Sequence, residues 1–135
     1  MRTLVLNVSQ ESGFDRPFET LVQQHADALL VGNDPFFLEW RSKIIALAER
    51  HGVPTIYSSR AYVAAGGLIS YGISIIEGYH QVGLYVGRIL KGDKAADLPV
   101  MSSIRFKLAI NITTARTLNL EVPSTVLAQA DEVIQ

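Results

Sequence analysis

Polar side chains with binding chemistry directly follow several short apolar runs of this chain. In chain order, these candidate residues are Asn33, Asp34, Ser58, Arg60 and Tyr71. A carboxylate can bind an ammonium group, a guanidinium can hold a carboxylate through two parallel hydrogen bonds, and amide and hydroxyl groups both donate and accept. A tyrosine adds an apolar wall with a polar tip. These residue types predict a site for a small organic molecule, and we expect the five residues to bind it.

Some of these residues also suit structural roles. Asp34 stands directly before a proline, which is the pattern of a helix N-cap followed by proline at the first helical position. Arg60 also suits a solvated helix position, since arginine is mostly exposed. The neighbouring Phe36, Phe37 and Trp40 recur at helical spacing, which favours packing against a core over an aromatic binding box. The polar candidates are therefore informative mainly as a set.

Motifs for catalysis and cofactor binding are missing from the sequence. It contains no G-x-x-x-x-G-K-[ST] loop, no G-x-G-x-x-G turn and no H-E-x-x-H. His25, His51 and His80 fall on different predicted elements without metal-ligand spacing, and there is no cysteine. Ser58 lies near Arg60, but no histidine or acid close in sequence could activate it. We therefore expect no catalytic residue, no metal site and no cofactor, and predict that the protein is not an enzyme.

Strand and helix patterns alternate along the first half of the chain. Apolar runs predict strands at 4–8, 28–32, 53–57 and 68–71. Helical patterns between them cover 15–25, 34–51 and 58–65. Runs that are apolar on both faces are typical of parallel sheets covered by helices on both sides, so we predict an α/β three-layer sandwich around a parallel sheet. Ligands bind such sheets outside the carboxyl ends of the strands, where the five candidates lie.

The last part of the chain predicts a different kind of strand. Alternation over 104–112 predicts one exposed face, with Phe106, Leu108 and Ile110 inward and Arg105, Lys107 and Asn111 outward. Thr113 is expected to cap a short helix that ends at Leu118. A last helix is expected to begin at Pro123 and Ser124 and to bury Leu127, Ala130 and Ile134.

A long helix is predicted from its N-cap Ser74 to Leu90. Its apolar stripe consists of Ile75, Tyr79, Val82, Val86 and Leu90. Gly83 and Gly87 lie on adjacent turns, so another backbone could approach closely there. If it were left bare, a stripe of this size would be unusual on a soluble monomer. The chain could cover it by folding the helix back on its own sheet or by pairing with a second copy. We therefore expect a homodimer through the helix at 74–90, with exchange of helices as one way to form it.

Composition limits the possible partners and locations. The net charge is −1 and no basic stripe with interleaved aromatic residues is present, so we expect no nucleic-acid partner. No signal peptide is visible after Met1, because the run at 3–8 is too short and too β-branched for one. No apolar run approaches the about 18 residues needed to span a bilayer. A length of 135 residues suits one domain.

Seven stretches follow one known pattern in order along the chain. They are ADALLVGNDPFF at 26–37, HGVPTIY at 51–57, AAGGLISYG at 64–72, VGRILKG at 86–92, ADLPV at 96–100, FKLAIN at 106–111 and AQADEVI at 128–134. Together they resemble the ABC-transporter substrate-binding proteins of the tryptophan/tyrosine type. The resemblance implies a type I periplasmic binding fold, in which two α/β lobes joined by three hinge strands enclose a cleft.

The resemblance also implies a division of the chain and a function. Residues 1–72 would be a partial second lobe, 73–101 the crossover helix and linker toward a first lobe that this chain lacks, and 102–135 the return strand and C-terminal helices; we treat 1–135 as one domain. The chain would be a solute-binding component, or a fragment of one, of an ABC importer. It would bind a small organic solute, such as an amino acid or aromatic compound, and its partner would be an ABC permease. Its location would be periplasmic or extracytoplasmic.

Two other interpretations stay open. One is a cytoplasmic small-molecule-sensing domain of the same fold, which in a transcription regulator would carry a DNA-binding headpiece that this sequence lacks. The other is a small flavodoxin-like enzyme or a receiver domain. A receiver would need an acidic cluster at the strand ends, where only Asp34 is suitably placed.

Overall fold

The structure is a computed structural model that describes residues 2–100 and 105–135. Its strands are β1 (Leu29–Leu30), β2 (Thr55–Tyr57), β3 (Ile69–Ile73), β4 (Phe106–Asn111) and β5 (Glu132–Ile134). Its α-helices are α1 (Asp15–Gln23), α2 (Pro35–Glu39), α3 (Arg41–Arg50), α4 (Arg60–Ala64), α5 (Ile75–Leu90), α6 (Ile112–Thr117) and α7 (Ser124–Leu127). Short 3₁₀ turns, η1 (Glu11–Gly13) and η2 (Ala95–Asp97), precede α1 and follow α5.

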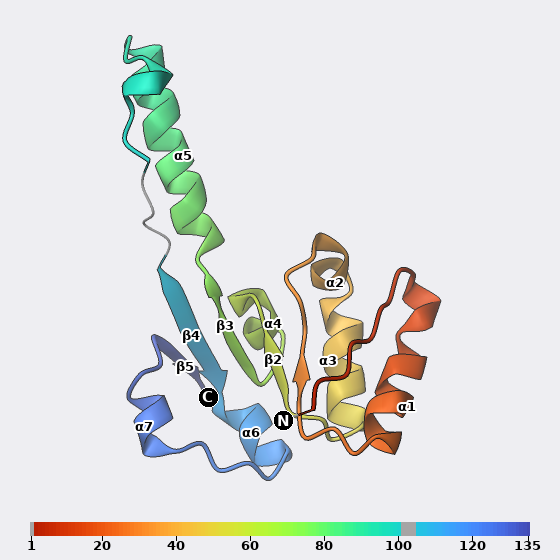
Figure 1. Cartoon of the computed structure of the whole chain (residues 1–135). Helices are drawn as coiled ribbons and strands as arrows, with labels where there is room; N and C mark the ends of the chain where they lie inside the picture. Colours follow the sequence, from red (N-terminus) through yellow and green to blue (C-terminus); the bar gives the residue numbers. More distant parts are fainter. Residues whose placement is uncertain (1, 101–104) are drawn as a thin grey trace.

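The five strands form one sheet in the order β1-β2-β3-β4-β5 (Figure 1). β1, β2 and β3 are parallel neighbours, β4 runs antiparallel to β3, and β5 is parallel to β4. The sheet is therefore mostly parallel and flanked by helices, which confirms the predicted α/β class. β1, β2 and β3 end at one edge of the sheet. Because β4 and β5 run the other way, they begin at that same edge.

Local sequence signals explain where several helices begin and end. Asp34 caps α2 with Pro35 at the first helical position, and Ser74 caps α5, as the sequence predicts. α3 ends where Gly52 takes a positive φ of 63°, a conformation that suits glycine. The single helix expected over 34–51 is instead two helices, α2 and α3, that meet at Trp40.

The hydrophobic core lies between α1, α3 and β2 with their neighbouring loops. Its most buried members include Phe14, Phe18, Leu21, Ile44, Leu47, Tyr57 and Tyr62. Phe36, Phe37 and Trp40 pack against this core, and the Phe14 and Phe36 rings stack at 5.6 Å between centroids. The helical spacing of these aromatic residues was thus a core signal, as predicted.

Two strand predictions are wrong in detail. Residues 4–8 form no strand, although Leu6 and Val8 pack against the core. β4 does not have one exposed face: Ile110 and its successor Asn111 are both buried, whereas Phe106 is 56% exposed. Burial therefore changes along β4 rather than between its two faces. Residues 109 and 110 pair with strands on both sides, β3 and β5, whereas residues 106–108 pair with β3 alone. The predicted start of this strand at Ile104 lies outside the described residues.

The C-terminal helices also differ from the prediction. Asn111, rather than Thr113, caps α6, since its Oδ1 accepts a hydrogen bond from the Thr114 N–H at 3.0 Å. The expected last helix is short, and residues 132–134 form β5 instead. Backbone and side chain of Asp131 both bond to the Leu108 backbone, at 2.9 and 2.8 Å, which directs the chain into the sheet beside β4.

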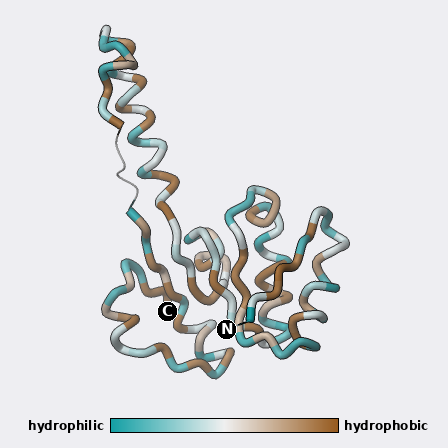
Figure 2. The backbone as a smooth tube through the Cα atoms, in the orientation of Figure 1, coloured by the Kyte–Doolittle hydropathy of each residue, from teal (hydrophilic) through white to brown (hydrophobic). Residues whose placement is uncertain are grey.

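α5 projects away from the sheet, and none of its residues is buried (Figure 1). Hydrophobic positions recur along its exposed length (Figure 2). Its bounds match the predicted helix at 74–90, including the cap. No helix in the described ranges combines the length and apolar character required to cross a membrane.

Candidate functional site

The candidate site is the sheet edge at which β1, β2 and β3 end. Asp34 follows β1, and its Oδ1 accepts a hydrogen bond from the Phe36 N–H at 2.7 Å. Ser59 follows β2, and its hydroxyl accepts one from the Ala61 N–H at 3.3 Å. Ser74 follows β3 and caps α5 in the same way. Three helices therefore begin at this edge, each after the strand that precedes it.

The loop after β2 crosses closely over β3 at Gly72. A Cβ atom at Gly72 would lie 1.9 Å from the carbonyl oxygen of Ser58. Only glycine leaves room for this contact. The contact holds the Ser58 backbone, and with it the start of α4, against the end of β3.

Arg60 is paired with a residue from the far end of the chain. Its Nε and Nη2 donate to the two carboxylate oxygens of Glu132 on β5, both at 2.5 Å. This bidentate bond lowers the pKa of Glu132 and raises the pKa of Arg60. Arg60 does grip a carboxylate with two hydrogen bonds, as its chemistry allows, but that carboxylate belongs to the protein. Glu132 is a member of this edge that sequence analysis missed, because nothing local connects residues 72 positions apart.

Tyr71 lies on a different face of the sheet from the Ser58 loop. Gly72, against which that loop packs, and the buried Ser70 share one face of β3, and Tyr71 points to the other. There Tyr71 is 55% exposed and stacks on Phe106 of β4 at 5.3 Å. The structure thus places the loops of Asn33, Asp34, Ser58 and Arg60 at one edge, with Tyr71 near the same edge but across the sheet. No hydrogen bond or ion pair among the described residues joins any two of the five.

Two buried tyrosines lie behind this edge. Tyr57 and Tyr62 stack at 4.5 Å, and burial raises the pKa of each to about 12. The pKa of Tyr62 is also lowered by Arg41 and raised by Asp34, so both charges act on its hydroxyl. That hydroxyl is buried and has no hydrogen-bond partner among the described residues. Tyr57 was identifiable as the end of an apolar run, whereas no local signal indicated that Tyr62 would be buried beside it.

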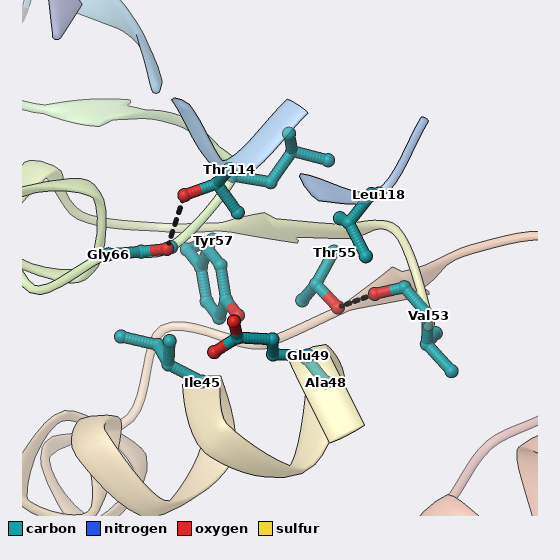
Figure 3. Close-up of a pocket in the computed structure, with 11 residues that line it drawn as sticks. Ile45, Ala48, Glu49, Val53, Thr55, Tyr57, Gly66, Thr114 and Leu118 are labelled. Atoms are coloured by element: carbon teal, nitrogen blue, oxygen red, sulfur yellow. Dashed lines mark hydrogen bonds between the residues drawn. The ribbon is translucent and has the colours of Figure 1, made fainter. Parts of the chain in front are cut away.

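Two of the hollows in the described residues are well defined, and none of the five candidates lines either one. The first is a void of about 10 Å³ between α3, β2 and α6 (Figure 3). It is lined by residues such as Ile45, Thr55, Tyr57 and Thr114, and it is at the lower limit for a single water molecule. The second is an open groove beside α5, lined by Glu77, Tyr79, Tyr85 and Arg105 among others. Whether the candidate edge binds a solute stays a prediction.

Charged side chains at the edge do not gather into a metal site. Within residues 2–100 and 105–135, no group of three or more histidine, aspartate or glutamate side chains could hold a metal ion. The chemistry that this edge offers is hydrogen bonding and charge pairing from Asp34, Ser58 and Arg60.

Solved structures show where this arrangement occurs elsewhere. A conserved domain protein from Vibrio cholerae O1 biovar El Tor superposes with a TM-score of 0.76 at 24% identity, covering 88% of this chain and 40% of its own. The ABC domain of a Streptococcus pneumoniae protein in complex with L-Trp gives 0.75 at 30% identity, covering 85% and 39%. CD0873, a substrate-binding protein with adhesive properties from Clostridium difficile, gives 0.67 at 22% identity, covering 95% and 42% in its ligand-free, open structure.

The chain spans about two fifths of the length of each of these structures. A search of curated proteins gave no match. The family model for ABC transporter substrate-binding proteins matches residues 18–134, which is nearly the whole chain. Because this match covers most of the chain, the chain belongs to the ABC transporter substrate-binding protein family.

Proposed function

We propose that this chain is a solute-binding component, or part of one, of an ABC importer, and that the edge where β1, β2 and β3 end forms one wall of the solute site. The observation that carries the proposal is the family match over residues 18–134. The shared edge of three parallel strands supports it, since ligands of open α/β sheets bind outside the carboxyl ends of the strands.

The proposed solute is a small organic molecule, such as an amino acid or an aromatic compound. Asp34 is exposed and suits an ammonium group. Glu132 occupies Nε and Nη2 of Arg60, which leaves the Nη1 donors of Arg60 for a carboxylate. Asn33 and Ser58 would add hydrogen bonds and Tyr71 an apolar wall, while the pneumococcal neighbour at 30% identity was solved with L-Trp.

The proposed role is binding and delivery without a chemical step. No catalytic residue, metal or cofactor enters the proposal, and the partner of the loaded protein would be an ABC permease in a periplasmic or extracytoplasmic setting. The proposed wall touches the solute on one side only, and a solute held in this way keeps much of its surface in water. We therefore expect weak binding by the 135-residue chain.

Thermal unfolding with added solutes tests this proposal. We would screen L-tryptophan, L-tyrosine, L-phenylalanine, other amino acids, nucleotides and divalent metal ions. At a concentration about 100 times Kd, a bound solute stabilises the folded state by about 2.7 kcal/mol. Stabilisation by nucleotides or metal ions, and by none of the organic solutes, would overturn the proposal.

Variants locate the site. Asp34→Asn keeps a capping side chain and removes the charge, so we expect folding to persist and affinity to fall about tenfold. Arg60→Ala should weaken binding of carboxylate-bearing solutes. Arg50→Ala is the matched control, because Arg50 is similarly exposed (61% against 59%) and also pairs with an acid, Asp15, on α1 rather than at the edge. Equal losses of affinity in both arginine variants would show that Arg60 is not part of the solute site.

A further inference from the structure

Both ends of the Arg60 side chain are held in the structure. Its backbone begins α4, where Ser59 caps the helix and the contact between Ser58 and Gly72 holds the preceding loop. Its guanidinium donates from Nε and Nη2 to the two carboxylate oxygens of Glu132, each at 2.5 Å. A long side chain that is 59% exposed would otherwise sample many rotamers. The pair with Glu132 therefore orders a side chain that its surroundings leave largely open.

Glu132 stands on a strand that is anchored where it begins. The Asp131 N–H donates to the Leu108 carbonyl oxygen at 2.9 Å, and the Asp131 carboxylate accepts from the Leu108 N–H at 2.8 Å. Glu132 follows directly and pairs in register with Ala109 of β4. The Glu132 carboxylate thus reaches Arg60 from a rigid element of the sheet, which is a suitable support for a binding group.

The pair leaves part of the guanidinium free to bind a second acid. An arginine carries five N–H donors, and Nε with one N–H of Nη2 supplies the two that bond to Glu132. The other N–H groups, on Nη1 and Nη2, have no acceptor among the described residues. They form a second fork, of the kind that holds a carboxylate through two parallel bonds. Because Glu132 fixes the plane of the guanidinium, it also fixes the direction of this open fork.

We propose that Glu132 is a positioning residue of the solute site, which holds the open fork of Arg60 ready for a carboxylate group of the solute. The inference rests on the proposed function, and it narrows the solute class to molecules that carry a carboxylate, such as amino acids. An arginine that is ordered in advance loses less rotamer freedom when the solute binds. Glu132 acts on the solute only through Arg60.

A conservative variant separates the position of the acid from its charge. Glu132→Asp keeps the charge and shortens the side chain by one methylene group, so it should lose at least one of the two parallel bonds. We expect the dissociation constant for L-tryptophan to rise by up to about tenfold, the scale for one long side chain that must be ordered on binding. The dissociation constant for L-tryptophanamide, which lacks the carboxylate, should not change. Thermal unfolding of the 135-residue chain with each compound measures both values.

The matched control is Glu11→Asp. Glu11 is also an exposed acid (51% against 36% for Glu132), and it pairs with Lys43 of α3 instead of Arg60. This variant should bind both compounds as the parent does. An amino acid that stabilises the parent more than L-tryptophan would replace it, together with its own carboxamide.

A double-mutant cycle tests whether Glu132 acts through Arg60. In an Arg60→Ala background, Glu132→Asp should have no further effect on L-tryptophan binding, because the group that it positions is gone. A general contribution of Glu132 to the sheet would instead lower the affinity in both backgrounds. Thermal unfolding without solute shows that each variant stays folded.

The outcomes separate this inference from the proposed function. Unchanged or tighter binding of L-tryptophan by Glu132→Asp would overturn the inference, and tighter binding would show that Glu132 competes with the solute for Arg60. Equal losses for L-tryptophan and L-tryptophanamide would also overturn it. Stabilisation of the parent only by solutes without a carboxylate would overturn the inference and leave the proposed function in place. Stabilisation by no organic solute would overturn both.

Discussion

α4 and α5 are both helices that follow a strand of the same sheet, yet they use their apolar residues in opposite ways. α4 has five residues and buries Tyr62 and Val63 almost completely. α5 has sixteen residues and buries none. A five-residue helix is unstable alone and depends on tertiary packing, whereas a long capped helix can rely more on its own hydrogen bonds. The difference indicates that α4 belongs to the stable body of the fold, whereas α5 adds no buried side chain to it.

The largest expected effect compares a core side chain with one on α5. Ile110→Ala should lower the free energy of unfolding by about 2–5 kcal/mol, because Ile110 is 1% exposed and its removal leaves a cavity. Leu84→Ala should change it by less than about 0.5 kcal/mol, since Leu84 is half exposed. Urea denaturation of both variants measures the two values. Comparable losses would show that α5 is part of the cooperative core.

A second comparison places the same substitution at two glycines. Gly72→Ala should destabilise the fold by about 3 kcal/mol, because the new Cβ atom would collide with the carbonyl oxygen of Ser58. Gly78→Ala on α5 meets nothing within 4 Å and should favour the helix by about 1 kcal/mol. Thermal unfolding followed by circular dichroism distinguishes them. A Gly72→Ala variant as stable as the parent would mean that the Ser58 loop is not held against β3.

The smallest expected effect compares two exposed ion pairs. Arg60 lowers the pKa of Glu132, so this pair contributes stability above the ordinary pKa of a glutamate, about 4.3. That contribution is lost as the pH falls through the lowered pKa of folded Glu132. Glu132→Gln should therefore lower the melting temperature slightly at neutral pH, and the difference from the parent should vanish in acid. Glu77→Gln removes the ion pair between Glu77 on α5 and Lys107 on β4, and it should leave the melting temperature unchanged. Equal shifts in both variants would contradict the separation of body and α5.

Much of the fold was predictable because its signals are local. Asp34 before Pro35, Ser74 before an amphipathic run, and Gly52 after a helix each act through the backbone of the next few residues. The apolar runs ending at Gly32 and Tyr57 likewise predicted parallel strands. The break between α2 and α3 at Trp40 lay within a continuous helical pattern, and no proline or glycine marked it.

The sequence was enough to predict at which end of the strands the candidate residues lie, but not their contacts there. The order of strands and helices places Asn33, Asp34, Ser58 and Arg60 at the carboxyl ends of β1 and β2. The partner of Arg60 was not predictable, because Glu132 reaches it only through the pairing of β4 with β5. The side of the sheet to which Tyr71 points follows from the register of β3 against β4, and no local pattern sets that register.

Residue types and their order along the chain were thus enough for the family, the α/β class, the caps of α2 and α5, and the apolar stripe of α5. The caps and the stripe depend on spacing within one or two turns, which the backbone converts directly into structure. The strand at residues 132–134 emerged only from tertiary contacts. The spacing of Leu127, Ala130 and Ile134 fits a helix, but the open edge of β4 offers residues 132–134 backbone hydrogen bonds in the sheet. That partner strand is separated from β5 by α6, α7 and their loops, beyond the reach of any local signal.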